Sequence, residues 1–221
     1  MAFFTDRFGI KEVADVKFYN TGDIIYNEAK GELFLRETTV TPVLELETLK
    51  VSTLEFTGET TEARGGKGNA VLMSWDHSRE ATLTLEDALL STKALNLLLS
   101  NTALTGDAGT TGGSTVVTVD ANGFPGTYTV VGKTYARGVD GKDHLFTFLV
   151  FKAKVQPEAT LTMEAEGDPS TLNMTLKVLR CVTEDTKMGA KSGEMIKLIL
   201  DENTSGDKTP EITWPTQKAT T

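Results

Sequence analysis

Strict alternation of apolar and polar residues is the feature that most constrains this fold, because it recurs in segment after segment. In residues 50–60, for example, Leu54 and Phe56 alternate with threonine and glutamate. A period of two is typical of half-buried antiparallel strands. The segments with this pattern, or with many aromatic and β-branched residues, are 50–60, 79–86, 126–135, 144–155, 159–166, 171–181 and 194–202. The sequence therefore predicts a mainly β domain of the α+β type, with a sandwich-like or barrel-like fold.

One segment departs from this pattern and predicts a helix. Residues 84–100 contain few β-branched residues, and their leucines recur at helical spacing. We therefore expect one flanking helix at about 86–99, begun by a capping box at Thr84 and Asp87. The alternative is a break at Ser91, which would cap a second helix.

The domain organisation is simple, because no shift in composition marks an internal boundary. We expect a single domain over residues 1–201. Residues 102–125, which include the Gly/Thr-rich run 105–116, are expected to form a variable loop. Residues 202–221 are polar and contain two prolines, which predicts an extended C-terminal tail.

Charge and composition exclude several classes of function. The chain has 221 residues and a formal net charge of −9. Phosphate contacts need clustered lysine and arginine, so we expect no tight binding of nucleic acid, although DNA could pass such a protein without sticking. No apolar run approaches the roughly 20 residues that span a bilayer, and we expect neither export nor membrane insertion. The one cysteine, Cys181, lies in an alternating apolar run and is expected to be buried.

Motifs for catalysis or ligand binding are missing from the sequence. The stretch Arg64–Gly68 is rich in glycine, but it lacks the spacing of a P-loop and opens no helix. His77 and His144 accompany no recognisable nucleophile motif. The acidic residues at 164–168 match no calcium-binding loop. We therefore expect no enzyme, no metal and no cofactor.

Two hairpins are expected from the turn residues between strand segments. Residues 164–171 contain Asp-Pro, which fits a type I turn and joins the strands on either side. The glycines of 63–69 permit positive φ and predict the tip of another hairpin, between 50–62 and 79–86. The tip would expose two bases to the acids of a partner. The candidate contact residues at this tip are Arg64, Gly65, Gly66, Lys67, Gly68 and Asn69.

The polar faces of these two hairpins have an unusual composition. They consist largely of threonine and glutamate, and Lys177 is the one base among them. Ordinary solvent-exposed faces mix both signs of charge. The residues of this predicted face are Thr53, Glu55, Thr57, Glu59, Glu80, Thr82, Thr84, Thr160, Thr162, Glu164, Glu166, Thr171, Asn173 and Thr175, and Glu86 continues the register. A plain solvent-facing sheet surface is the alternative interpretation.

Much of the chain resembles a known family. Residues 8–20, 46–91 and 151–179 are similar to the major tail tube proteins of tailed bacteriophages, chiefly long-tailed phages of Gram-positive hosts. The most specific parts are "GGKGN" with the following "WD" and "LEDAL", and the run from "KVQ" to "GDPST". Residues 102–143 and the C-terminal tail carry little of the resemblance.

The resemblance implies a fold and an assembly. Six copies would form a ring, and the rings would stack into a hollow tail tube that conducts DNA. Four strands of each subunit would join those of its neighbours in a continuous inner β-barrel, whose lumen the threonine and glutamate side chains named above would line. The partners that it implies are further copies of the chain, the tape measure protein, the tail terminator and the distal tail proteins.

Two functions are compatible with the sequence. The first is a structural subunit of the virion tail, made in the host cytoplasm. The second is a monomeric β-sandwich module that binds a glycan or receptor on the host surface, with the 105–116 loop and the C-terminal tail as contact elements.

Overall fold

The computed structural model describes residues 7–37, 39–99, 117, 119, 122–156, 171–182, 187–201 and 210–217. Over these residues the chain is mainly β with one α-helix, as the alternating pattern predicts. The strands are β1 (Phe8–Ile10), β2 (Asp15–Asn20), β3 (Ile24–Asn27), β4 (Glu32–Leu35), β5 (Leu44–Leu46), β6 (Leu49–Gly65), β7 (Ala70–Asp87), β8 (Thr127–Gly138), β9 (Asp143–Val155), β10 (Leu172–Val178), β11 (Ile196–Asp201) and β12 (Thr216–Gln217). The helix α1 (Thr92–Leu99) follows β7.

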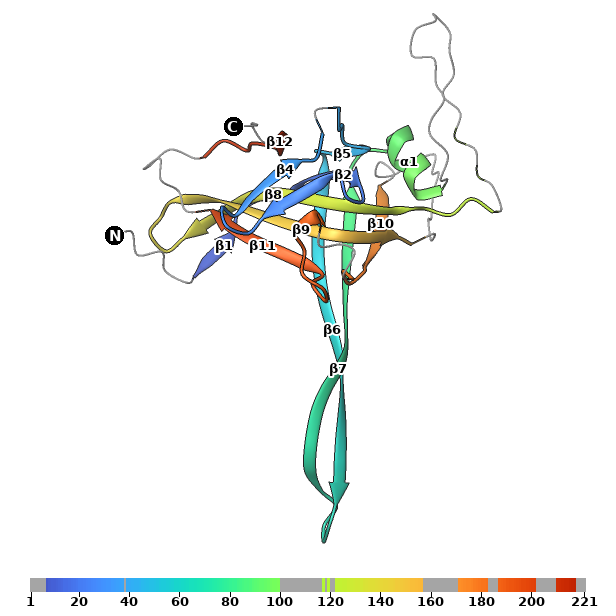
Figure 1. Cartoon of the computed structure of the whole chain (residues 1–221), viewed down its shortest axis with the longest axis vertical. Helices are drawn as coiled ribbons and strands as arrows, with labels where there is room; N and C mark the ends of the chain where they lie inside the picture. Colours follow the sequence, from blue (N-terminus) through green and yellow to red (C-terminus); the bar gives the residue numbers. More distant parts are fainter. Residues whose placement is uncertain are drawn as a thin grey trace, which may run out of the picture.

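The strands form two sheets, one large and one small. The large sheet has nine strands, in the order β5-β2-β8-β9-β10-β7-β6, with β1 paired to β8 and β11 paired to β9. The small sheet has the order β12-β4-β3. The pairing of β12 with β4 is parallel, and the other pairings are antiparallel. Figure 1 shows a body made from most strands, from which β6 and β7 project together as a long ribbon.

The central strands β2, β8 and β9 are covered on both faces. Neighbouring residues in a strand point to opposite faces, and here both faces are dry. In β2, Phe18 packs into one hydrophobic cluster while Tyr19 packs into the other. Val130 and Val131 of β8 divide in the same way. The first cluster includes the buried face of α1, and the second is completed by the small sheet, which gives the expected sandwich-like arrangement.

The helix begins later than the sequence predicts. The expected start near residue 86 is wrong, because β7 continues to Asp87 and α1 begins at Thr92. Thr84 belongs to the strand ladder rather than to a capping box. Ser91 is the cap, since its hydroxyl accepts a hydrogen bond from the backbone N–H of Ala94 at 3.0 Å. Burial of the apolar side chains of β7 therefore overrides the helical preference of this segment.

The described part of the C-terminal tail is extended and packs against the body of the protein. Residues 210–217 end in β12, and Trp214 packs against the second hydrophobic cluster. The Nζ atom of Lys17 lies 4.6 Å from the centroid of the Trp214 ring. These contacts attach the segment to the body rather than leaving it in solvent.

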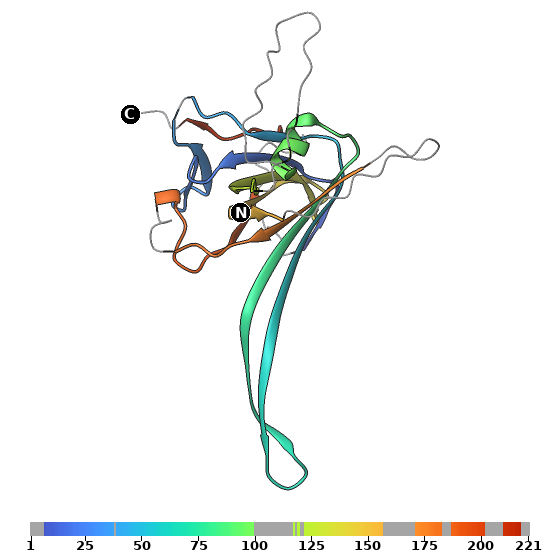
Figure 2. The same cartoon turned by 90° about the vertical axis from the view of Figure 1, so that its right-hand side faces the viewer.

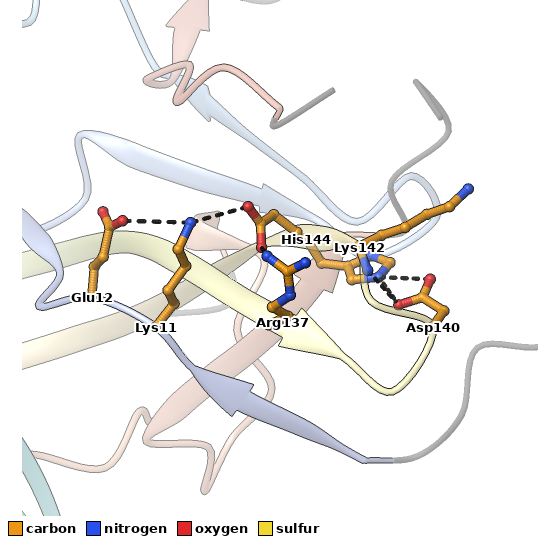
Figure 3. A network of polar contacts seen from close by, with 7 residues as sticks. Lys11, Glu12, Arg137, Asp140, Lys142 and His144 are labelled. Carbon is orange, nitrogen blue, oxygen red and sulfur yellow. Dashed lines mark hydrogen bonds and ion pairs between the residues drawn. The ribbon is translucent and has the colours of Figure 1, made fainter. Parts of the chain in front are cut away.

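A polar network attaches β1 to the hairpin of β8 and β9 (Figure 3). The carboxylate of Asp143 receives Lys11 Nζ at 3.1 Å and an Arg137 guanidinium nitrogen at 3.2 Å. Nearby, Nε2 of the buried His144 lies 3.3 Å from a carboxylate oxygen of Asp140. The histidine thus joins the polar contacts at the turn between β8 and β9.

The packing of β8 against β9 depends on one glycine. Gly132 lies opposite Phe148 in the ladder. A Cβ atom at Gly132 would come within 2.1 Å of the Phe148 ring. The ring therefore occupies the space over the glycine, in a core that has no room for a side chain there.

We expect Gly132→Ala to lower the free energy of unfolding by about 1–3 kcal/mol, because the buried ring must move. Gly9→Ala is the matched control, since a Cβ there meets nothing within 4 Å. It should change the stability by less than about 0.5 kcal/mol. Urea denaturation measures both variants, and equal losses would contradict the importance of the glycine–ring contact.

Candidate functional site: a polar sheet face and a projecting arm

The register of β6, β7 and β10 places the predicted polar residues on one face. Thr84 of β7 lies between Thr53 of β6 and Thr175 of β10. The next row along the sheet is Glu55, Thr82 and Lys177. The residues that the structure gathers on this polar face are Thr53, Glu55, Thr57, Glu80, Thr82, Thr84, Glu86, Asn173, Thr175 and Lys177.

The opposite face of the same strands is buried. Leu83 and Leu176 are 0% exposed, and Leu54 packs beside them. The side chains that alternate with these leucines are therefore directed away from the core. The polar face lies on the outer side of a sheet whose inner side forms part of the main hydrophobic cluster.

The polar face is net acidic among the described residues. It carries the three carboxylates of Glu55, Glu80 and Glu86 against the single ammonium of Lys177. Lys177 Nζ lies 2.9 Å from an oxygen of Glu80, so this cation is already paired across the ladder. The charge that remains uncompensated on the face is negative.

The other predicted members of this face do not all lie on it. Glu59 lies farther along β6, beyond β10, and pairs with His77. Thr171 is half-buried just before β10. Thr160, Thr162, Glu164 and Glu166 lie outside the described residues.

Beyond β10, the strands β6 and β7 continue as a two-stranded arm. The last pair between β10 and β7 is Val178 with Ala81, and the arm extends from there to the turn at 66–69. Residues 57–65 span about 30 Å at roughly 3.3 Å per residue. Figures 1 and 2 both show this arm leaving the body.

The arm contains more strand than the sequence predicts. Its second strand was expected to begin at residue 79, and this expectation is wrong because β7 begins at Ala70. Thr57 pairs with Glu80 but Glu59 pairs with His77, so β7 carries an extra residue there. A second shift follows between Ala63 and Arg64. These β-bulges interrupt the period of two, and solvent on both sides of the arm removes the apolar–polar contrast that reveals a strand.

The tip is a tight turn, as the glycines predict. Gly66, Gly68 and Asn69 have φ values of 81°, 91° and 51°. Glycine adopts positive φ without steric cost, and asparagine tolerates it better than most other residues. Lys67 is exposed at this tip. Arg64 is also exposed, but its guanidinium already lies 2.6 Å from a carboxylate oxygen of Glu62 on the same strand.

An apolar strip on the arm is the feature that the sequence interpretation missed. Val71, Leu72, Met73 and Trp75 are 45%, 68%, 65% and 49% exposed. Four large apolar side chains this close together are unusual on a solvent-exposed ribbon and mark an interaction surface. The available signal was the run "VLMSW", whose apolar residues do not alternate with polar ones.

Comparison with known protein families finds one whose model matches this chain. The model of the YomU/Tube protein family matches residues 27–111 and 104–192, which together span most of the sequence. The chain belongs to the YomU/Tube protein family. No curated protein matched it.

Both the arm and the described polar face fall within the matched residues. Membership of the YomU/Tube family fits a bacteriophage tail tube protein and implies a structural component of the virion tail that assembles with itself and with other tail proteins.

Metal-binding clusters, membrane helices and the lone cysteine were the other features to compare with the sequence expectations. Within the described residues, no group of three or more His, Cys, Asp or Glu side chains could hold a metal ion. No described helix has the length and the apolar character needed to cross a membrane. Cys181 is 1% exposed, which confirms its predicted burial.

A buried lysine of the body contacts the C-terminal segment. Burial lowers the pKa of Lys133, although nearby Asp201 acts in the opposite direction. Burial likewise raises the pKa of Asp201, and the charge of Lys133 opposes that shift. Lys133 donates a hydrogen bond to the carbonyl oxygen of Thr213, so this buried ammonium holds the C-terminal segment in place.

Strand β10 offers a direct test of the two faces. We expect Leu176→Ala to lower the free energy of unfolding by about 2–5 kcal/mol, because it leaves a cavity in the core. Lys177→Ala, one residue along, should cost no more than about 1 kcal/mol, because its ion pair is exposed. Guanidinium denaturation measures the two variants, and a larger loss at Lys177 would contradict a solvated polar face.

Proposed function

We propose that six copies of this chain form a ring, and that the rings stack into the hollow tail tube that conducts phage DNA to the host cell. The observation that carries the proposal is the acidic polar face on β6, β7 and β10, which the register holds opposite the core. Its threonines and glutamates would line the lumen. The chain would be made in the host cytoplasm and become part of the virion tail.

The edge of the large sheet supports ring formation. In the described part of the chain, β6 has β7 as its one ladder neighbour and ends the strand order. Its outer N–H and C=O groups can pair with a strand of the next subunit, which is assembly by strand addition. Closure of the ring would then leave no β6 edge exposed in the inner barrel. With a fourth strand from residues 159–166, each subunit would supply four strands to an inner barrel.

An acidic lining suits the passage of DNA. Phosphates bind to clustered lysine and arginine, and the described polar face presents one lysine that is already paired with Glu80. Carboxylates on the wall repel the DNA backbone over roughly a Debye length, about 8 Å at physiological salt. The genome would therefore meet no strong contact as it moves. The tape measure protein, the tail terminator and the distal tail proteins would be the remaining tail partners.

The lumen assignment can be tested with a cysteine at Thr57, in a Cys181→Ala background. In assembled tubes we expect the thiol to react with a small maleimide but not with a maleimide coupled to a folded carrier protein, because the carrier is too large for the bore. Glu37→Cys is the control outside the polar face and should react with both reagents. Mass spectrometry of the tubes measures the labelling, and carrier labelling at residue 57 would reject the lumen position.

The tip of the arm is proposed to contribute to contacts between rings. We expect the double variant Arg64→Glu and Lys67→Glu to require a higher protein concentration for tube assembly. Each exposed ion pair is worth about 0–1 kcal/mol, but the contact repeats around the ring.

The matched control for the arm tip is Lys30→Glu with Arg36→Glu, which makes the same charge change at exposed residues outside the arm. Sedimentation and negative-stain electron microscopy measure the assembly of both double variants. Unchanged assembly of the arm variant would argue against this role of the tip.

A further inference from the structure

A mostly apolar groove lies beside the root of the arm. It has a volume of about 550 Å³ and is formed by residues of β1, β6, β8, β9 and β11 and of the segment that follows β1. Its most exposed apolar side chains are Ile10, Val13, Val51, Phe56 and Leu198, at 60%, 42%, 43%, 51% and 55%. Apolar side chains that are this exposed within one hollow indicate a surface that a partner covers.

The apolar strip of the arm, formed by Val71, Leu72, Met73 and Trp75, has the apolar character needed to cover such a groove. Its residues are neighbours on one strand of a two-stranded ribbon, and their side chains are 45–68% exposed. Tryptophan is enriched among the residues that dominate binding energy. Methionine adapts its shape to irregular apolar surfaces.

The strip cannot reach the groove of its own chain. Phe56 of the groove and the strip belong to the same β-ladder, in which the strip lies opposite residues 61–64 of β6. A spacing of five to eight residues along a strand separates them by about 15–25 Å. Because the paired strands hold this separation, a contact between the strip and such a groove requires a second molecule.

The features of the two surfaces favour a second copy of this chain as that molecule. Glu59, whose side chain is 72% exposed, lies on the same side of the arm as Trp75, two rows away. Lys50 lines the groove and offers the opposite charge. Strip and groove are different surfaces on one chain, so their contact is head-to-tail and can repeat without limit. Each copy supplies one strip and one groove, which leaves neither uncovered along an extended assembly.

We propose that the strip Val71–Trp75 of one copy packs into the groove beside Ile10, Phe56 and Leu198 of the next copy. This inference rests on the proposed tube, and it assigns to the arm an apolar anchor in addition to its charged tip. The contact buries the exposed strip of each arm and the groove of its neighbour. The charged residues of the tip would then set the orientation, while the apolar strip would supply most of the affinity.

A cross-linking experiment tests the contact. The variant carries Met73→Cys and Leu198→Cys in a Cys181→Ala background, and it is assembled before treatment with a short bismaleimide. We expect a ladder of covalent oligomers on a denaturing gel. The matched control replaces Leu198→Cys with Glu37→Cys, an exposed position outside the groove, and should give no ladder.

The outcomes separate this inference from the proposed function. Tubes that assemble but give no ladder, or give one only with the control pair, would overturn the groove contact and leave the tube intact. A cross-link within single chains would show that the strip fills its own groove and would also overturn it. A wild-type chain that stays monomeric at high concentration would contradict both proposals.

A substitution in the groove gives a second readout that does not depend on linker geometry. Leu198→Glu places a charge on a side chain that is 55% exposed, so the fold of the single copy should persist. We expect the concentration needed for assembly to rise about tenfold or more. In a Trp214→Phe background, acrylamide quenching of Trp75 should fall when the native chain assembles. Unchanged quenching in fully assembled tubes would reject burial of the strip.

Discussion

The antiparallel ladder of β10, β7 and β6 is the constraint on which the rest of the molecule depends. Its register sends Leu83 and Leu176 into the core and, because the side-chain period is two, sends Thr82 and Lys177 outward. A slip of one residue would exchange the two sets and bury glutamate and threonine in place of leucine. Burial of the leucines on the inner face therefore determines which residues lie on the outer face.

Packing on both faces of β2, β8 and β9 fixes the position of the ladder of β10, β7 and β6. Leu149 and Val150, adjacent in β9, are both 0% exposed and belong to different hydrophobic clusters. A strand fixed on both faces cannot rotate or slide without loss of contacts on both sides. Since β9 pairs with β10 and β10 pairs with β7, the root of the arm takes its orientation from the most deeply buried part of the sheet.

The sequence predicts the strands well wherever one face is dry and the other is wet. Leu83 and Leu85 reveal β7 near the body because Thr82 and Thr84 alternate with them. From Ala70 to Ser78 the sequence pattern does not reveal the same strand, because solvent surrounds the arm and bulges change the period. An alternating sequence pattern arises only where a strand has one buried and one solvated face, and both faces of the isolated arm are solvated.

The boundary between β7 and α1 and the docking of the C-terminal segment were harder to predict, because both depend on contacts with residues far away in the sequence. The leucines after Leu85 suit a helix, but the ladder partners of Glu86 and Asp87 keep these residues in β7. The docking of Trp214 depends on a surface built by residues far away in the sequence, including Lys17. The polar face was predicted because its residues share a strand period. The groove was not predicted because it combines residues of β1, β6, β8, β9 and β11, which are far apart in the sequence.

The register shifts along β6 and β7 carry a consequence for the chain before it assembles. Among the described strands, β6 has a ladder partner on one side only, and an edge of seventeen residues is a template for uncontrolled strand pairing between free molecules, the route to fibrous aggregates. Irregularities after Leu49, Thr57 and Ala63 divide this edge into short regular stretches. Long in-register stacking of identical arms is therefore disfavoured, which keeps newly made chains available for ordered growth.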